Sequence, residues 1–121
     1  MSRHVIVDDE ALTELEAAVE YYEQCQAGLG ADFYALVLAA LDRIASPPDL
    51  STPEPTDSRA RRILLQRFPF AVVFFVRGDN ADVVAVMDLR RRPGYWRSRR
   101  SLRRPGAKPK RPRTRRPRTK R

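Results

Sequence analysis

Apolar positions in the first half of the chain follow the periods of a strand and of two helices. Residues 3–7, RHVIV, are rich in β-branched side chains and predict a short strand. Two later segments carry apolar residues at spacings of three and four, the pattern of one helix face. They are Leu12, Leu15, Val19 and Tyr22 in the first segment, and Phe33, Val37, Ala40, Leu41 and Ile44 in the second. Gly28 can end the first helix and Pro47 and Pro48 the second, so an antiparallel helical hairpin is expected.

The second half of the chain reads as strands that follow a polar, proline-rich loop at residues 46–58. Residues 61–68 (RRILLQRF), 70–77 (FAVVFFVR) and 82–89 (DVVAVMDL) are each predicted to be strands. The middle one is apolar on both faces, as a central strand covered on both sides would be, and GDN at 78–80 is a strong hairpin signal. The predicted order is β-α-α-β-β-β. This is an α+β domain with a helical hairpin packed on a small, largely antiparallel sheet.

Charge divides the chain into three parts. Residues 1–57 carry a net charge of −10, residues 58–96 carry +5, and residues 97–121 contain 14 Lys and Arg and no acid. We therefore expect one domain over residues 1–96, acidic on its helices and basic on its strands, and a separate tail. The tail contains four prolines and, past Leu102, no large apolar residue, so it is predicted to be disordered. It is expected either to bind nucleic acid through counterion release or to be only a solvated basic extension.

The single cysteine bears on the cellular compartment. Cys25 cannot form an intrachain disulfide, which fits a reducing cytoplasm. No apolar run approaches the roughly 20 residues of a transmembrane helix, and no signal peptide precedes the first predicted strand. The chain is therefore expected to be soluble and cytoplasmic, with no membrane partner.

Three blocks of the sequence together resemble one protein family. They are YYE…GLG..F within residues 21–33, RFPF at 67–70 and RRRPGYW at 90–96. In order and spacing, residues 3–100 are similar to the RelE/ParE toxins of bacterial type II toxin–antitoxin systems, the plasmid stabilisation type. The resemblance implies a RelE/ParE-like fold and a toxin neutralised by a cognate antitoxin. It also implies one of two activities: some members cleave mRNA on the ribosome without a metal, and others bind DNA gyrase and poison it without being enzymes. Because both kinds share the fold, the fold alone does not choose between them.

Ribosome-associated mRNA cleavage is the leading expectation, and it requires three tasks at one phosphate. The 2′-OH must lose a proton, the pentavalent phosphorane must be stabilised, and the 5′-oxygen must be protonated. Arginines suit the second task. Arg62 and Arg67 on one predicted strand, and Arg90 and Arg91 after another, are expected to converge on the phosphate. Tyr95 is expected to orient the substrate, to donate a proton or to stack on a base. No metal or other cofactor is expected.

A general base is harder to find in this sequence. Many relatives look like AHHRRRPGYW at this end, with histidine where this chain has Asp88 and Leu89. Beside the arginines that follow it, the carboxylate of Asp88 should be stabilised as an ion, so we expect an ion pair rather than a base. The only histidine, His4, lies on the first predicted strand, where a surface or packing role is expected.

The sequence leaves two alternatives to RNA cleavage open. The missing histidine and the net charge of −5 over residues 1–96 both weaken the nuclease and favour a gyrase poison, in which the same basic end binds protein. A decayed toxin, kept as a nucleic-acid-binding module by its tail, is the other alternative. The aromatic residues have structural explanations as well: Tyr21 and Tyr22 are expected to pack or to contact the antitoxin, and Trp96 to close the end of the sheet or to stack on a base.

Overall fold

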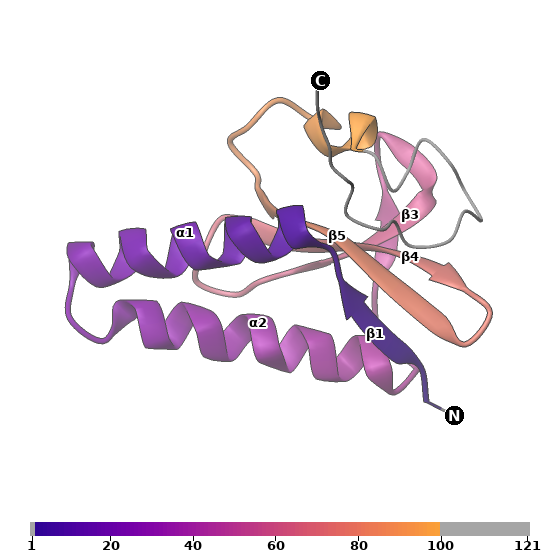
Figure 1. Ribbon diagram of the computed structural model, residues 1–121, viewed down its shortest axis with the longest axis horizontal. Helices are drawn as coiled ribbons and strands as arrows, with labels where there is room; N and C mark the ends of the chain where they lie inside the picture. Colours follow the sequence, from indigo (N-terminus) through magenta and orange to yellow (C-terminus); the bar gives the residue numbers. More distant parts are fainter. Residues whose placement is uncertain (1, 100–121) are drawn as a thin grey trace, which may run out of the picture.

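The two helices form the hairpin that the apolar pattern predicts. The computed structural model describes residues 2–99, with α1 at Asp9–Cys25 and α2 at Leu29–Ala45 lying side by side in opposite directions (Figure 1). Their buried residues repeat at helical spacing and are Ala11, Leu15 and Ala18 on α1, and Gly30, Phe33, Val37, Ala40 and Ile44 on α2. Over the described residues, neither helix nor any other is long and apolar enough to cross a membrane.

The turn between the helices is closed by a side chain from α1. Gly28, in the left-handed region with a φ of 91°, has no side chain with which to cap α2. The carboxylate of Glu23 accepts hydrogen bonds from the backbone N–H groups of Gly28 and Gly30 instead, and so satisfies donors that every helix start leaves open. Gly30 also lets the helices approach closely, because a Cβ at this position would lie 2.6 Å from the backbone oxygen of Val19.

Five strands form one sheet in the order β1-β5-β4-β3-β2. The strands are β1 (His4–Val7), β2 (Thr52–Glu54), β3 (Asp57–Leu64), β4 (Phe70–Arg77) and β5 (Asn80–Asp88). β1 is parallel to β5 and the other neighbouring pairs are antiparallel, which confirms the predicted α+β fold with a largely antiparallel sheet. A short 3-10 helix at Tyr95–Ser98 follows β5.

The prediction of a loop over residues 46–58 is wrong in part, because this segment contains β2, a strand that the sequence did not predict. Thr52 pairs with Arg62 and Pro53 with Arg61 at the edge of the sheet. A proline is tolerated there, since an edge strand can turn its missing N–H away from the ladder. The same pairing makes β3 begin at Asp57, earlier than the predicted start at residue 61.

The predicted strand at 61–68 is also too long at its other end. β3 stops at Leu64, and Arg67 has a φ of 75°, a left-handed conformation that a strand does not contain. The backbone N–H of Leu65 donates to the oxygen of Phe70, and the N–H of Phe70 to the oxygen of Phe68. Arg67 therefore belongs to the turn between β3 and β4 and does not share a strand with Arg62.

β4 is buried on both faces, which confirms the prediction from its continuous apolar sequence. On the helix side, Phe70 packs against Phe33 of α2, with 4.9 Å between the ring centroids. On the other face, Phe75 packs edge-on against Trp96, which is fully buried and comes from the 3-10 helix. This second core attaches the segment after β5 to the sheet and so positions the candidate site.

The tail predicted at residues 97–121 lies outside the described residues from residue 100 onward. Its first residues, Arg97–Arg99, are described and continue the fold past residue 96. The backbone N–H of Arg97 donates to the oxygen of Gly94, and that of Arg99 to the oxygen of Trp96. The side chain of Arg99 also binds Glu14 of α1.

Candidate functional site at the end of β5

The backbone of the basic segment after β5 is held by a series of hydrogen bonds. The N–H of Leu89 donates to the oxygen of Pro69 in the β3–β4 turn, and the N–H of Arg91 donates to the oxygen of Asp88. Gly94 has a φ of 74°, and this left-handed conformation turns the chain into the 3-10 helix. The segment is therefore presented on a backbone that is fixed at both ends.

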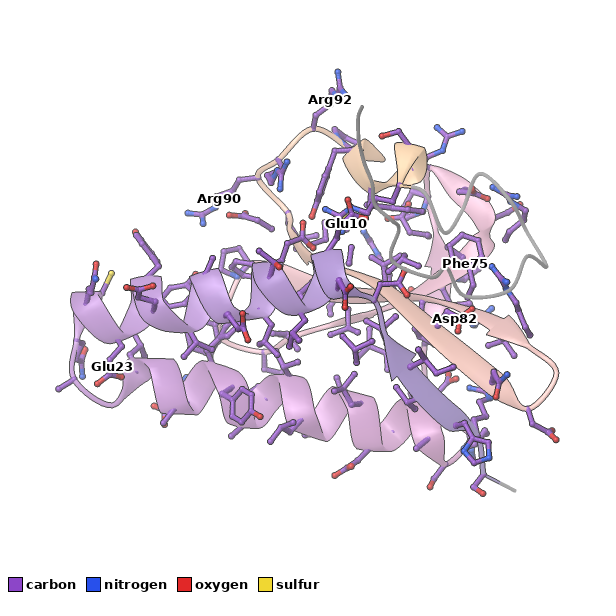
Figure 2. The ribbon with its side chains drawn as sticks, viewed as in Figure 1. Glu10, Glu23, Phe75, Asp82, Arg90 and Arg92 are labelled. Carbon is purple, nitrogen blue, oxygen red and sulfur yellow. The ribbon has the colours of Figure 1, made fainter. Side chains whose placement is uncertain are left out.

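Three exposed arginines follow β5, and the first of them is paired with Asp88. Figure 2 shows Arg92 directed away from the helices, whereas Arg90 lies close enough to α1 to interact electrostatically with Tyr21 and Tyr22. One carboxylate oxygen of Asp88 accepts hydrogen bonds from the backbone N–H and the Nε of Arg90, and the other accepts from its Nη2 at 2.8 Å. Hydrogen bonding by the Arg90 side chain lowers the pKa of Asp88, and this outweighs the opposing effect of burial. The predicted ion pair is confirmed, and it makes Asp88 a weak proton acceptor at neutral pH.

The hydroxyl of Tyr95 is also engaged. It donates a hydrogen bond to Oε2 of Glu14 in α1, and the guanidinium of Arg91 lies 3.7 Å from the centroid of its ring. Burial raises the pKa of Tyr95 strongly, and the hydrogen bond to the Glu14 carboxylate raises it further. Tyr95 is therefore a neutral phenol at physiological pH, and its hydroxyl donates its hydrogen bond to Glu14 inside the protein.

Glu14 is the centre of a network that the sequence patterns did not reveal. Its carboxylate accepts from Nη2 of Arg99 at 2.7 Å and from the backbone N–H of Val86 at 3.0 Å, besides the hydroxyl of Tyr95. Nη1 of Arg99 also donates to the oxygen of Val84 at 2.7 Å. Since β1 pairs with β5 only as far as Val83, these two side chains occupy hydrogen-bonding groups on the uncovered edge of β5.

A signal for Glu14 existed in the helical pattern. Ala11 and Ala18, three residues before and four after Glu14, are both buried where α1 approaches the sheet. An acid between two such small residues faces the sheet, whereas Glu16 and Glu20 on the other flank remain exposed. Arg99 had no such signal, because its neighbours in the sequence belong to the basic tail.

Arg62 and Arg67 are each paired with a carboxylate from another element. Arg62 pairs with Glu54 of β2, with 3.5 Å between Nη1 and Oε2, on the sheet face opposite the helices. Arg67 pairs with Asp32 of α2 at 3.3 Å and stacks over the ring of Phe68. Each of these guanidinium groups thus has a carboxylate partner from a different element.

The five residues predicted to converge on a phosphate are therefore distributed over separate contacts. Arg91 and Tyr95 share Glu14, although Arg91 approaches it only at 3.4 Å. Arg90 precedes Arg91 in the chain but binds Asp88. Across residues 2–99, no three His, Cys, Asp or Glu side chains are grouped so that they could hold a metal ion.

The remaining candidates have structural roles. His4 is exposed on β1, as expected for a surface histidine. Tyr22 packs on Phe33 and Phe68 in the core, whereas Tyr21 is exposed. Trp96 is fully buried against the face of the sheet opposite the helices, so its ring is not accessible to a nucleic-acid base.

Comparison with known proteins bears on the fold. No family model matches this sequence, and no curated protein matches it. Among solved structures, the chain is similar to one from the "Chromosomal ParDE TA system from P. aeruginosa", with a TM-score of 0.63 and 14% sequence identity. The match covers 73% of this chain and 97% of that chain. At this identity the likeness establishes that the two chains share a fold.

Proposed function

We propose that this chain is the toxin of a toxin–antitoxin pair and that it acts by binding its target rather than by cleaving RNA. Two features support the toxin assignment. The blocks YYE…GLG..F, RFPF and RRRPGYW resemble the RelE/ParE toxins, and the fold is shared with a chain of a ParDE system. A cognate antitoxin is then the protein partner, and DNA gyrase is the target that the resemblance implies for a toxin that acts by binding.

The observation that carries the binding mechanism is the protonation state of the two side chains best placed to transfer a proton. Efficient general acid–base catalysis at neutral pH needs a group whose pKa lies near 7. The pKa of Asp88 is lowered by its hydrogen bonds with Arg90, and the pKa of Tyr95 is raised by burial and by its bond to Glu14. The RRRPGYW end is thus well suited to present positive charge and poorly suited to move a proton.

The proposed target-binding surface is the exposed part of this end. Leu89 is 41% exposed and directly precedes the exposed residues Arg90–Arg92 in the chain. Arginine next to an accessible apolar side chain is typical of energetically important positions in protein interfaces. Because the backbone is already fixed by hydrogen bonds, little conformational entropy is lost when a partner binds.

Ribosome-associated mRNA cleavage is the second candidate. One observation favours it: three exposed guanidinium groups, those of Arg90, Arg91 and Arg92, follow one another at the point where the chain continues into its basic tail. Such a cluster can bind a phosphate chain and stabilise a phosphorane. In this version Arg62 and Arg67 would have to leave their carboxylate partners to join the site.

Expression of the full chain without an antitoxin should distinguish the two mechanisms. We expect replication to stop with trapped gyrase, while translation continues at first and messages remain intact. The purified full chain should inhibit supercoiling by gyrase, and Arg92→Ala should weaken this inhibition about tenfold, since losing an interface arginine costs about 1.4 kcal/mol. The measurements are plasmid supercoiling and the length distribution of cellular mRNA.

Arg43→Ala is the matched control for that experiment. Arg43 is an exposed arginine in the last turn of α2 and lies outside the proposed surface, so its loss should leave inhibition unchanged. Immediate translation arrest with cleaved messages would select the nuclease instead. Normal growth during expression would contradict both mechanisms.

The tail permits a separate prediction about nucleic acid. Truncation after Arg100 removes 11 Lys and Arg residues and no acid. Because each phosphate contact releases counterions, the truncated chain should bind single-stranded RNA more weakly and with a flatter dependence on salt concentration. Far-UV circular dichroism should show an intact fold. Equal affinities of the two chains at both low and high salt would rule out this role for the tail.

A further inference from the structure

A groove runs along α1 on its side toward Tyr34 of α2. Its volume is about 430 Å³, and its apolar side chains include Leu12, Val19 and Tyr34. Leu12 and Tyr34 are 42% and 45% exposed, so the groove presents accessible apolar surface. Such surface on a small domain commonly marks a place where another chain segment docks.

Acids form the rim of this groove. Glu16, Glu20 and Glu23 line it, and Figure 2 shows Glu23 at the end of α1 next to the turn. Among residues 2–99, no Lys or Arg forms an ion pair with any of the three. Within the described part of the chain, the carboxylate of Glu23 accepts only from backbone N–H groups. The groove therefore combines an apolar floor with uncompensated negative charge, which fits a segment that is basic and contains small apolar residues.

We propose that residues 100–121 of this same chain dock in the groove. They contain 12 Lys and Arg, four prolines and no acid, whereas residues 1–57 carry a net charge of −10. Prolines favour an extended, left-handed helical conformation that packs well on exposed apolar and aromatic side chains. The alternating basic residues can then reach the glutamates on the rim.

The chain enters this segment at α1 itself. The guanidinium of Arg99, the last described residue, binds Glu14 at 2.7 Å and approaches Glu10 at 3.8 Å, both in the first half of α1. A tail of 22 residues reaches at most about 79 Å when extended. The 17 residues of α1 span about 26 Å, so the tail is long enough to cross the helix and follow the groove. Tethering of this kind raises the local concentration of the tail to the millimolar range.

Docking in the groove and binding to a polyanion are mutually exclusive, because both use the same guanidinium and ammonium groups. The acidic groove then acts as an internal competitor for the tail. A nucleic acid must displace the tail from α1 before it can bind, and conditions that weaken ion pairs release the tail. The domain thereby limits non-specific binding by its own basic extension.

The single cysteine provides a direct test on the full chain. Cys25 is exposed at the end of α1, two residues after Glu23, and can carry a nitroxide label. At low salt, the backbone amide NMR signals of residues 100–121 should lose at least half of their intensity through paramagnetic broadening. About 0.5 M NaCl should restore them, since the Debye length falls to a few ångström. A mixture of nitroxide-labelled protein at natural isotope abundance and ¹⁵N-enriched protein without nitroxide should give no broadening, because the contact is within one chain.

Two charge-matched double variants decide whether the groove is responsible. Glu16→Gln/Glu20→Gln keeps the size of both side chains at exposed positions and should abolish the broadening. It should also raise the affinity of the full chain for a single-stranded RNA oligonucleotide about threefold to tenfold at low salt. Asp42→Asn/Asp79→Asn removes the same charge at exposed sites outside the groove and should change neither result.

Several outcomes would overturn the proposal. Equal broadening in both double variants would mean that the tail meets α1 through overall charge and not through this groove. Broadening that appears only in the mixed sample would assign the groove to a second copy of the chain. Full signal intensity at low salt in the unmutated chain would leave the groove to a separate partner protein.

Discussion

Replacing Trp96 with alanine should lower the free energy of unfolding by about 3–5 kcal/mol, the usual cost of truncating a large buried aromatic side chain. Trp96 is fully buried against the face of the sheet away from the helices, where it packs on Phe75 in a cluster that includes Val73. It also attaches the four-residue 3-10 helix to the sheet, so its loss should loosen the segment that presents the arginines after β5. Chemical unfolding followed by far-UV circular dichroism measures the change, because Trp96 is the only tryptophan and its fluorescence is lost.

Two further variants separate packing from hydrogen bonding. The indole Nε1 of Trp96 is buried and has no hydrogen-bond partner among residues 2–99. An unsatisfied buried donor costs about 1–3 kcal/mol, so Trp96→Phe should be less than half as destabilising as Trp96→Ala. Tyr34→Ala, at a site that is 45% exposed, should cost about 1 kcal/mol or less. A Trp96→Ala loss no larger than that of Tyr34→Ala would show that the second core contributes little.

The elements that could be predicted from the sequence are those whose signal is local. The apolar residues of α1 and α2 repeat every three or four positions, and β4 is apolar at nearly every position. The buried residues of each element can therefore be predicted from its own sequence. β2 has no such signal. Its three residues, Thr52–Glu54, form a strand only because β3 lies beside them. Arg67 was predicted on a strand because LLQRF is nearly continuous in apolar and long side chains, which hides a turn with a positive φ.

The same distinction applies to the candidate site. The ion pair of Asp88 with Arg90 could be predicted because the two residues are only two positions apart. The partner of Tyr95 is Glu14, 81 residues earlier in the chain, and that of Arg67 is Asp32. Contacts of this length are set by how the helices pack on the sheet. The sequence does not show which carboxylate lies nearest to each arginine. Residue types alone therefore suggested that the arginines would bind one phosphate together.

Glu14 should contribute more to stability than any other acid on α1, because its carboxylate accepts hydrogen bonds from Tyr95, Val86 and Arg99 at once. Its side chain is 14% exposed and that of Arg99 is 11% exposed. Removing one member of a buried ion pair leaves the other charge unpaired, at a cost of about 3–5 kcal/mol. Glu14→Ala should therefore destabilise the full chain by about this amount, as measured by chemical unfolding. Glu20→Ala, at an exposed position two turns further along α1, should change stability by about 0.5 kcal/mol or less.

A double-mutant cycle then tests whether the cost comes from the unpaired charge. Arg99→Ala leaves the carboxylate of Glu14 with Tyr95 and the backbone of Val86 as partners, so it should destabilise the fold less than Glu14→Ala. When both side chains are absent no charge is left buried, and the double variant should lose clearly less stability than the sum of the two single losses. Strict additivity would contradict a direct pairing of Glu14 with Arg99. It would mean instead that Glu14 stabilises the domain through its bonds to Tyr95 and to the uncovered edge of β5.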